Sequence, residues 1–407
     1  MITHTIYGGL GNQLYQIFTV IALAIRACDT CVFHRREPEG VPGNILPSGV
    51  AARITHWDTI FAKLAPYVRN KDPREEITMM GQFYHYSQPS HAYTPILLPR
   101  NPSKVNSLYH LDGYFQSYKY FDREFDTICR HLDIDGQCAQ VADLVRSHPI
   151  LGLLVDSFKT VDPVEATKCK QVEKNVINVA MHFRIGDYKT LSDNHPVMPA
   201  AYYERALTEL VARAELENIE EVHVYLFYDR PEEPEVTPIV EQLQRRISST
   251  IPVRYHHVPP QITEAPGRPL IGSMTEAQGL GRSLIGSMTE AQGLGRLLIG
   301  SMTEAQGLGR LLTDPEHMLL MSMCTHFIIA NSTFSLWSAY FAMRRRTDGR
   351  ETFAPTEQSC GGDVDPTDSL RHIRVYYPSV WFGRALQSTH YVGDMFPKGW
   401  ICIDASP

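Results

Sequence analysis

Residues 175–183, NVINVAMHF, form a mostly apolar run that predicts a buried strand. An amphipathic helix is predicted directly after it, at MPAAYYERALTELVARAELEN (198–218). Further strands are predicted at EVHVYLFYD (221–229), IPVRYHHV (251–258) and HIRVYYPSVWF (372–382), and THFIIANSTFSLWSAYFAM (325–343) predicts a strand, a polar turn and a helix. Strands that alternate with helices are typical of parallel sheets, so the sequence predicts an α/β fold.

The N-terminal segment shows the same order of elements. MITHTIY (1–7) predicts a strand, and GGLGNQ (8–13) predicts a turn. A helix follows, because apolar residues recur at helical spacing from Leu14 to Ile25. Asn12 is the expected N-cap of this helix.

The length of 407 residues suits two domains rather than one. The pattern divides near residues 160–175, which predicts an N-terminal domain over 1–170, a C-terminal domain over 171–385 and a tail over 386–407. Residues 269–310 interrupt the second domain with three copies of a 14-residue unit, x-LIGSMTEAQGLGR. Each copy holds three glycines, and each glycine costs about 1 kcal/mol in a helix interior. The sequence therefore predicts a duplicated loop insertion without a catalytic role.

Composition narrows the class of protein. The chain is 43% apolar and 20% charged, which is typical of a soluble globular protein. Its net charge of −7 argues against broad nucleic-acid binding. The apolar run from Leu14 to Ala27 contains polar residues and is shorter than the roughly 20 residues that a membrane helix needs. The only C-x-x-C pair, Cys28 and Cys31, has no second pair to complete a zinc site, so reduced structural thiols are expected.

Polar residues follow three of the predicted strands, in GGLGNQ (8–13), HFRIGDY (182–188) and NSTFS (331–335). Ligands of open α/β sheets bind outside the carboxyl ends of the strands, where all three segments are expected. NSTFS offers backbone N–H groups and hydroxyls at a helix N-terminus, which favours an anion. Arg184 adds a planar positive charge, and Gly9 and Gly11 allow the backbone to approach a ligand. Leu14 breaks the dinucleotide fingerprint G-x-G-x-x-G, and no P-loop motif is present.

Each segment taken alone also has a structural interpretation. NSTFS is typical of a helix cap, and GGLGNQ of a tight turn between strand and helix. Arg184 and Asp187 could form a local ion pair, and His182 alternates with strand core residues as a buried, hydrogen-bonded histidine would. Taken together, the three segments predict a pocket for a diphosphate.

These segments resemble glycosyltransferase family 11, the α-1,2-fucosyltransferases that use GDP-fucose. GGLGNQLYQ, LDGYFQSYKYF, HFRIGDY, MPAAYYERAL, MLLMSMCTHFIIANSTFSLWSAYF and PKGW match motifs of that family in its order. The resemblance implies a GT-B-like fold of two facing Rossmann-type domains, with the acceptor on the N-terminal and the GDP-sugar on the C-terminal domain. It also implies inversion at the fucose anomeric carbon, with no cofactor and no metal ion.

The resemblance carries over to particular residues. Arg184 falls on the family's first motif arginine, associated with the donor diphosphate. The catalytic candidates are Arg184, Asp187 and His182, and either of the last two is a candidate general base. The residues expected to bind the nucleotide sugar are Gly9, Gly11, Asn12, Gln13, Arg184, Asp229, Asn331, Ser332, Thr333 and Ser335.

The chain departs from the family at several positions. Ile185 stands in place of a second motif arginine, Arg230 in place of a second aspartate after Asp229, and Leu336 in place of a common tryptophan. The repeats are foreign to the family. A metal-dependent alternative would need a D-x-D at a strand end, whereas Asp133 and Asp135 are expected in a helix-and-turn setting.

The main hypothesis is an inverting transferase that moves L-fucose from GDP-fucose to a galactose-like acceptor. The alternatives are a silent nucleotide-sugar- or carbohydrate-binding relative and a transferase of another GDP-sugar. The expected partners are the donor and a glycan acceptor, without nucleic acid or an integral membrane segment. Because the first motif begins at residue 8, a cytoplasmic location is expected, with peripheral membrane association still open.

Overall fold

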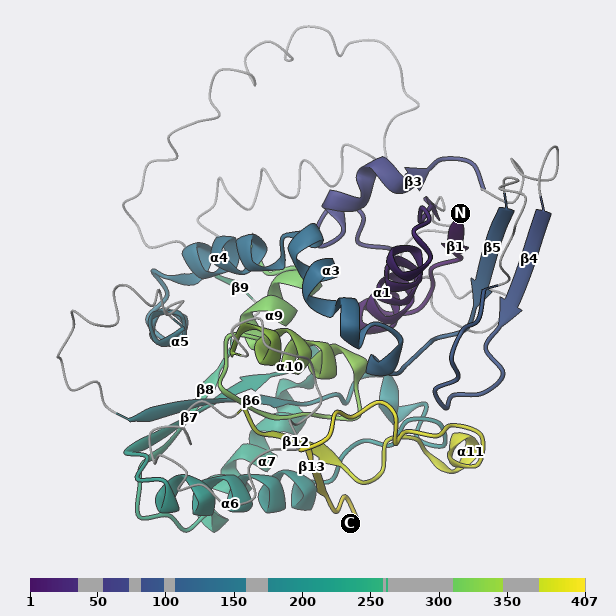
Figure 1. Ribbon diagram of the computed structural model, residues 1–407. Coiled ribbons are helices and arrows are strands. Elements are labelled where there is room, and N and C mark those ends of the chain that lie inside the picture. Colours follow the sequence, from purple (N-terminus) through teal and green to yellow (C-terminus); the bar gives the residue numbers. More distant parts are fainter. Residues whose placement is uncertain are drawn as a thin grey trace, which may run out of the picture.

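The computed structural model describes residues 1–35, 54–72, 82–98, 107–158, 175–258, 261–262, 310–346 and 373–406. Figure 1 shows its two sheets with helices between them. Of the predicted repeat insertion, Arg310 alone lies within the described residues.

The N-terminal sheet has three parallel strands in the order β1-β5-β4. They are β1 (Ile2–His4), β4 (Gln82–Ser87) and β5 (Ser107–Asp112), and a separate parallel pair joins β2 (Phe33–His34) to β3 (Val68–Arg69). The helices of this half are α1 (Leu10–Ala27), α3 (Phe125–Leu132), α4 (Ile134–Val145) and α5 (Leu151–Ser157), with 3-10 turns at Ala62–Tyr67, Tyr118–Tyr120 and Asp122–Glu124.

The larger sheet has six parallel strands in the order β13-β12-β11-β6-β7-β8. They are β6 (Val176–His182), β7 (Glu221–Phe227), β8 (Val253–His257), β11 (His326–Ile328), β12 (Val375–Pro378) and β13 (Ile401–Ile403). Its helices are α6 (Ala200–Leu216), α7 (Glu233–Arg246), α9 (Asp314–Met321), α10 (Thr333–Arg346) and α11 (Arg384–Gln387), with 3-10 turns at Asp187–Lys189 and Arg230–Glu232. The predicted α/β fold with two parallel sheets is confirmed.

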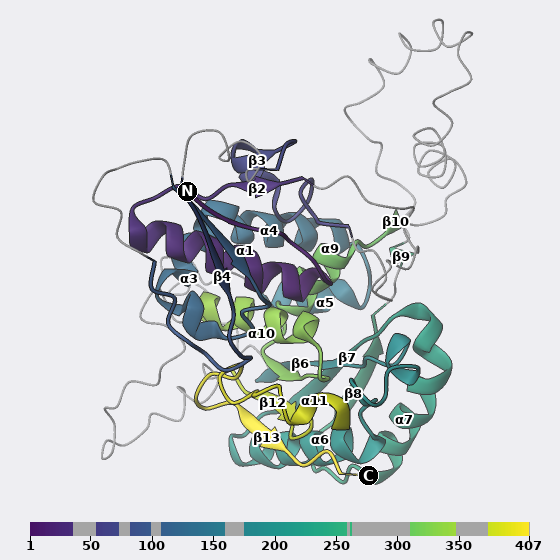
Figure 2. The ribbon, with the colours of Figure 1, turned by 90° about the vertical axis from the view of Figure 1, so that its right-hand side faces the viewer.

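The apolar sequence of β6 is explained by cover on both faces of its sheet. Val179 and Met181 lie in a core with residues of α6 and α7, whereas Ala180 belongs to the core that α9 and α10 share with the N-terminal half. Figure 2 shows α6 and α7 on one side of the large sheet and α10 on the other. A strand covered on both faces has no polar alternation, as the sequence of β6 indicates.

Helix α10 joins the two halves of the molecule. Its Trp337 packs against Tyr15 and Phe18 of α1, with ring centroids 5.2 Å and 4.7 Å apart. At its other end, Arg344 donates to Asp126 of α3 and Asp135 of α4, each over 2.9 Å. Through these contacts, α1 of the N-terminal half and α10 of the C-terminal half share one hydrophobic core. The domain boundaries at 170/171 and 385/386 remain predictions.

Helix α1 begins at Leu10 with Gly9 as N-cap, so the prediction of Asn12 as N-cap was wrong. The side chain of Asn12 does not cap α1 and instead accepts hydrogen bonds from Thr333 and Gln116. Asp135 lies within α4 and Asp133 precedes it, as expected for a helix-and-turn setting. The predicted tail contains β13, which pairs with β12 at the edge of the sheet.

Candidate functional site

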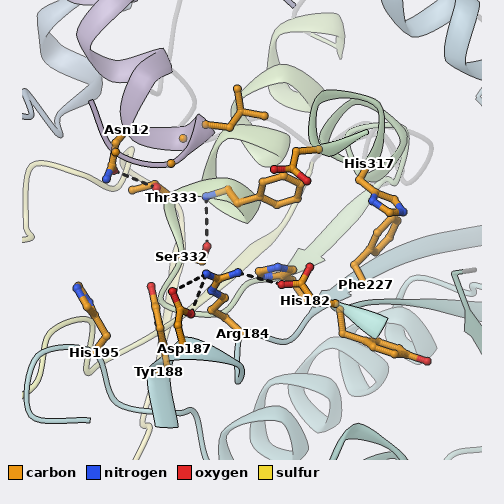
Figure 3. Close-up of a pocket in the computed structure, with 18 of the residues that line it drawn as sticks. Asn12, His182, Arg184, Asp187, Tyr188, His195, Phe227, His317, Ser332 and Thr333 are labelled. Atoms are coloured by element: carbon orange, nitrogen blue, oxygen red, sulfur yellow. Dashed lines mark hydrogen bonds and ion pairs between the residues drawn. The ribbon is translucent and has the colours of Figure 1, made fainter. Parts of the chain in front are cut away.

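A pocket of about 380 Å³ lies where the two halves meet, at the carboxyl ends of β1, β6 and β7. All three polar segments predicted from the sequence contribute to its lining. The predicted residues that line it are Gly9, Gly11, Asn12, His182, Arg184, Asp187, Asp229, Ser332 and Thr333. Figure 3 shows Arg184 and Asp187 on one side of this space, with Asn12, Ser332 and Thr333 facing them.

Two helices begin at the pocket wall. Helix α1 begins at Leu10 and α10 at Thr333, and both residues line the pocket. Neither helix has an acidic residue in its first turn, and no side chain caps α1. At the start of α10 the Ser332 hydroxyl accepts from the Phe334 N–H over 3.3 Å. The N–H groups of the first turn of α1 and the positive ends of both helix dipoles favour a bound anion.

The two helix starts are in close contact. A Cβ atom at Gly11 would lie 2.5 Å from Thr333 Oγ1 and 2.6 Å from the Thr333 backbone carbon, so glycine is required there. Asn12 Oδ1 accepts hydrogen bonds from Thr333 Oγ1 (3.2 Å) and from Gln116 Nε2 (2.8 Å). Asn12 thus ties the start of α1 to α10 and to the segment after β5.

Arg184 is the cation that faces these helix starts (Figure 3). Its Nη2 lies 2.8 Å from Asp187 Oδ1, and its Nη1 lies 3.2 Å from Asp229 Oδ2. The guanidinium also lies over the ring of Tyr188, 5.4 Å from its centroid. Burial lowers the pKa of Arg184, but the charges of Asp187, Tyr188, Asp229 and Glu232 together outweigh this and raise it. The arginine is therefore a fixed positive charge, held in place by two carboxylates.

The loop that carries Arg184 is shaped by Glu232, which the sequence patterns did not reveal. The Oε1 atom of Glu232 accepts from the backbone N–H groups of Ile185 (2.9 Å) and Gly186 (2.5 Å), and Oε2 accepts from that of Asp229 (3.1 Å). Burial raises the pKa of this carboxyl, although the two hydrogen bonds from Ile185 and Gly186 lower it. No sequence motif predicts this role, because hydrogen bonds from backbone N–H groups to a carboxylate depend on the folded shape of the loop.

Ile185 points away from the pocket. Its side chain is 4% exposed and packs in the core that contains Phe183, Met198 and Tyr202. Neighbouring side chains at the end of a strand point to opposite faces, so Arg184 faces the pocket and Ile185 the core. The position where the resembling family has a second arginine is therefore a core position in this chain.

His182 is buried, as its alternation with core residues indicates, but it is not fully hydrogen-bonded. Its ring stacks on Phe334 with centroids 5.7 Å apart, and its Nδ1 has no hydrogen-bond partner in the described residues. Burial lowers the pKa of His182 to about 3, and the nearby Arg184 charge adds to this effect. The imidazole is therefore neutral near pH 7.

Three predicted binding residues do not line the pocket. The Nε2 atom of Gln13 donates to the backbone oxygens of Gly8 and Ile54. Asn331 Nδ2 donates to the backbone oxygens of Pro196 and Trp381, and Ser335 Oγ donates to that of Ser332. In this structure these three side chains stabilise the turns around the pocket.

Further residues line the pocket that the sequence patterns did not single out. Phe227, Tyr228 and Val258 lie at the ends of β7 and β8, and Asp314, His317 and Met321 belong to α9. Others are Tyr114, Tyr188, Leu191 and His195. Tyr114 and Tyr188 belong to recognised motifs, whereas Leu191 and His195 lie in an irregular turn that has no periodicity to mark it. Figure 3 shows His195 at one end of the pocket and Phe227 with His317 at the other.

Two features are absent from the described residues. No group of three or more histidine, cysteine, aspartate or glutamate side chains is placed to hold a metal ion in the described part of the chain. None of the helices in the described ranges is both long and apolar enough to cross a membrane.

Comparisons with known proteins bear on the C-terminal motif. The family model "Glycosyl transferase family 11" matches residues 301–350, which include α9, β11 and α10. Among solved structures, the chain is similar to a point mutant of Arabidopsis thaliana FUT1 in complex with GDP, with 9% identity, a TM-score of 0.33 and coverage of 84% of this chain and 68% of that one. No curated protein matches the chain. Residues 301–350 thus identify the chain as similar to glycosyl transferase family 11, as its sequence motifs predict.

Proposed function

We propose that this protein transfers L-fucose from GDP-fucose to a hydroxyl of a galactose-like acceptor, with inversion and an α-1,2 linkage. The observation that carries the proposal is the meeting of Arg184 with the starts of α1 and α10 around one pocket. The sequence motifs and the family match at residues 301–350 support the choice of donor and reaction.

The proposed reaction breaks the bond between the fucose anomeric carbon and the diphosphate. Negative charge develops on the leaving GDP, and preorganised donors stabilise that charge in the transition state. Arg184 and the N–H groups at the two helix starts are the groups proposed for this task. Each hydrogen bond to a charged group contributes roughly 1.5–3 kcal/mol. Asp187 and Asp229 are proposed to orient Arg184, since both already contact its guanidinium.

The two ends of the pocket suit different parts of the reactants. Phe227, Tyr228 and Met321 offer aromatic and apolar surface for a flat nucleoside. Tyr114, Tyr188 and His195 contribute aromatic wall that suits the C–H face of a sugar. With the diphosphate beside Arg184 between these ends, the donor fucose lies toward His195.

The proposal is tested by product analysis with GDP-fucose and an array of acceptors, together with calorimetry of GDP binding. The expected result is GDP binding and a fucosylated product with inverted configuration, unchanged by EDTA because the charge-stabilising groups belong to the protein. GDP binding without transfer or donor hydrolysis would favour the silent relative, and turnover of a different GDP-sugar would replace the donor. The cytoplasmic location remains a prediction.

A further inference from the structure

We propose that His195 is the general base of this enzyme and takes the proton from the acceptor hydroxyl. The inference rests on the transfer reaction proposed above and adds a residue that neither the motifs nor the comparisons assign. Inverting transfer by a single displacement needs a base beside the attacking hydroxyl, on the side of the sugar opposite the leaving diphosphate.

The position of His195 fits this requirement. Its imidazole stacks on the ring of Tyr188, with centroids 5.0 Å apart and planes at 21°. Figure 3 shows Tyr188 between His195 and Arg184, so the imidazole lies one tyrosine ring away from the guanidinium. Arg184 and His195 line the same pocket, so a fucose whose diphosphate contacts Arg184 is proposed to direct its anomeric carbon toward an acceptor oxygen beside His195. Reacting atoms in such a complex lie about 3–3.5 Å apart.

Aromatic packing holds the imidazole in place without using its nitrogens. The ring of Phe382 packs beside it with centroids 5.7 Å apart, and the hydroxyl of Tyr188 donates to the Asn331 backbone oxygen over 3.2 Å. Within the described residues, neither ring nitrogen of His195 forms a hydrogen bond or an ion pair. A lone pair on the imidazole is therefore available to a substrate.

Charged and titratable groups around His195 set its protonation. Burial lowers the pKa of His195, the Asp187 carboxylate raises it, and His390 and Arg184 lower it, with a net direction downward. Tyr188 faces the ring of His195 directly. His91 and His390 stack on each other, and both pack against Phe382. The imidazole is thus neutral near pH 7, as a base must be.

The two bases expected from the sequence are less suitable. His182 stacks on Phe334, and its pKa of about 3 makes it a weak base. Asp187 lies 2.8 Å from Arg184 through one oxygen and 2.9 Å through the other, so both of its oxygens contact the guanidinium. Unlike Asp187, His195 has ring nitrogens that no group of the described residues uses, and it does not share the strongly lowered pKa of His182.

The proposed step balances in atoms and charge. The acceptor O–H proton moves to a ring nitrogen of His195 while the oxygen lone pair forms the new C1–O bond. The C1–O bond to the diphosphate breaks, and its electron pair leaves on the β-phosphate oxygen of GDP. The imidazolium then returns its proton to solvent.

The test compares His195→Gln with His390→Gln in the full-length protein. His390 contacts Phe382 in the same aromatic cluster but does not line the pocket, so it is the matched control. We expect His195→Gln to lower the kcat of transfer by roughly 10²–10⁴-fold, with GDP binding by calorimetry unchanged. It should also lose the acidic limb of the pH–rate profile. His390→Gln should keep its rate at neutral pH and keep the limb, moved toward higher pH because the His390 charge that lowers the pKa of His195 is gone.

A second variant guards against a purely structural effect. His195→Ala leaves space for free imidazole, which we expect to restore part of the transfer rate. If His195→Gln transfers fucose at the wild-type rate with an unchanged acidic limb, the assignment of His195 is overturned while the proposed function stands. If the wild-type protein transfers no fucose to any acceptor, the proposed function fails and the base assignment fails with it.

Discussion

Gly11 of α1 and Thr333 of α10 touch through backbone and side chain, although they are far apart in the sequence. A Cβ at Gly11 would lie 2.5 Å from Thr333 Oγ1. This contact sets the two helix starts beside each other, and with them the N–H groups that face the pocket.

Gly11→Ala is expected to force the two helix starts apart. Overpacking of this kind costs about 1–3 kcal/mol, because a neighbouring backbone atom, only 2.6 Å from the new methyl group, must shift. Chemical denaturation should show a lower free energy of unfolding, and calorimetry weaker GDP binding. Gly9→Ala is the control for stability, since no atom lies within 4 Å of a Cβ built there. Equal stabilities of the two variants would contradict the role of the contact.

Arg184→Ala is expected to abolish transfer and leave the fold intact. The variant removes the cation and leaves Asp187 and Asp229 to repel a diphosphate, so kcat/KM should fall by at least roughly a hundredfold. Lys189→Ala is the control, because Lys189 lies in the same loop, pairs with Glu235 and does not line the pocket. Wild-type turnover of Arg184→Ala would show that the arginine is misassigned.

Ile185→Arg is expected to destabilise the protein rather than to strengthen donor binding. The side chain at this position is 4% exposed and lies in an apolar core, where an unpaired charge costs several kcal/mol. Ile185→Val, which removes one methylene group, should cost only about 0.5–1.5 kcal/mol. Thermal denaturation of both variants checks this order. A stable Ile185→Arg protein with tighter GDP binding would place this side chain in the pocket instead.

The low pKa of His182 predicts a loss of stability in acid. The folded state keeps His182 neutral down to a pKa of about 3, because of burial and the charge of Arg184. In the unfolded chain a histidine takes up its proton near about pH 6.5. Between these values the unfolded state binds more protons, so the free energy of unfolding falls as the pH falls. His182→Phe removes this contribution, and urea denaturation from about pH 7 to about pH 4 should give a shallower pH dependence than in the wild type. Parallel curves would argue against a buried neutral imidazole.

Deletion of residues 269–296, the first two repeat copies, is expected to leave transfer and folding largely unchanged. The segment that contains the insertion is closed by a strand pair, because β9 (Gln261–Ile262), which precedes the insertion, runs antiparallel to β10 (Arg310–Leu311), which begins at its last residue. Shortening a loop whose ends stay in place alters its closure entropy by less than about 1 kcal/mol. Kinetic assay and thermal denaturation check both points. A folded but inactive product would show that the repeats take part in catalysis.

The sequence predicted site residues correctly where a polar motif directly follows a strand. HFRIGDY and NSTFS bring Arg184 and Thr333 into the same pocket, because parallel strands present their carboxyl ends at one edge. Glu232 escaped prediction because its role depends on the backbone N–H groups of another loop. Gln13 and Ser335 belong to the right segments, but their side chains point into the turns rather than the pocket. Segment patterns predict which loops meet, whereas the direction of each side chain depends on tertiary packing.

The short β9–β10 pair has an evolutionary consequence. Every copy of the repeated unit ends in arginine, at Arg282, Arg296 and Arg310, and the last of these pairs with Glu316 in the capping box that begins α9. Slippage in the coding sequence that adds or removes whole copies always leaves an arginine in front of Leu311. A change in the number of whole copies would therefore leave the β9–β10 pair and the contact of the arginine with Glu316 at the start of α9 in place.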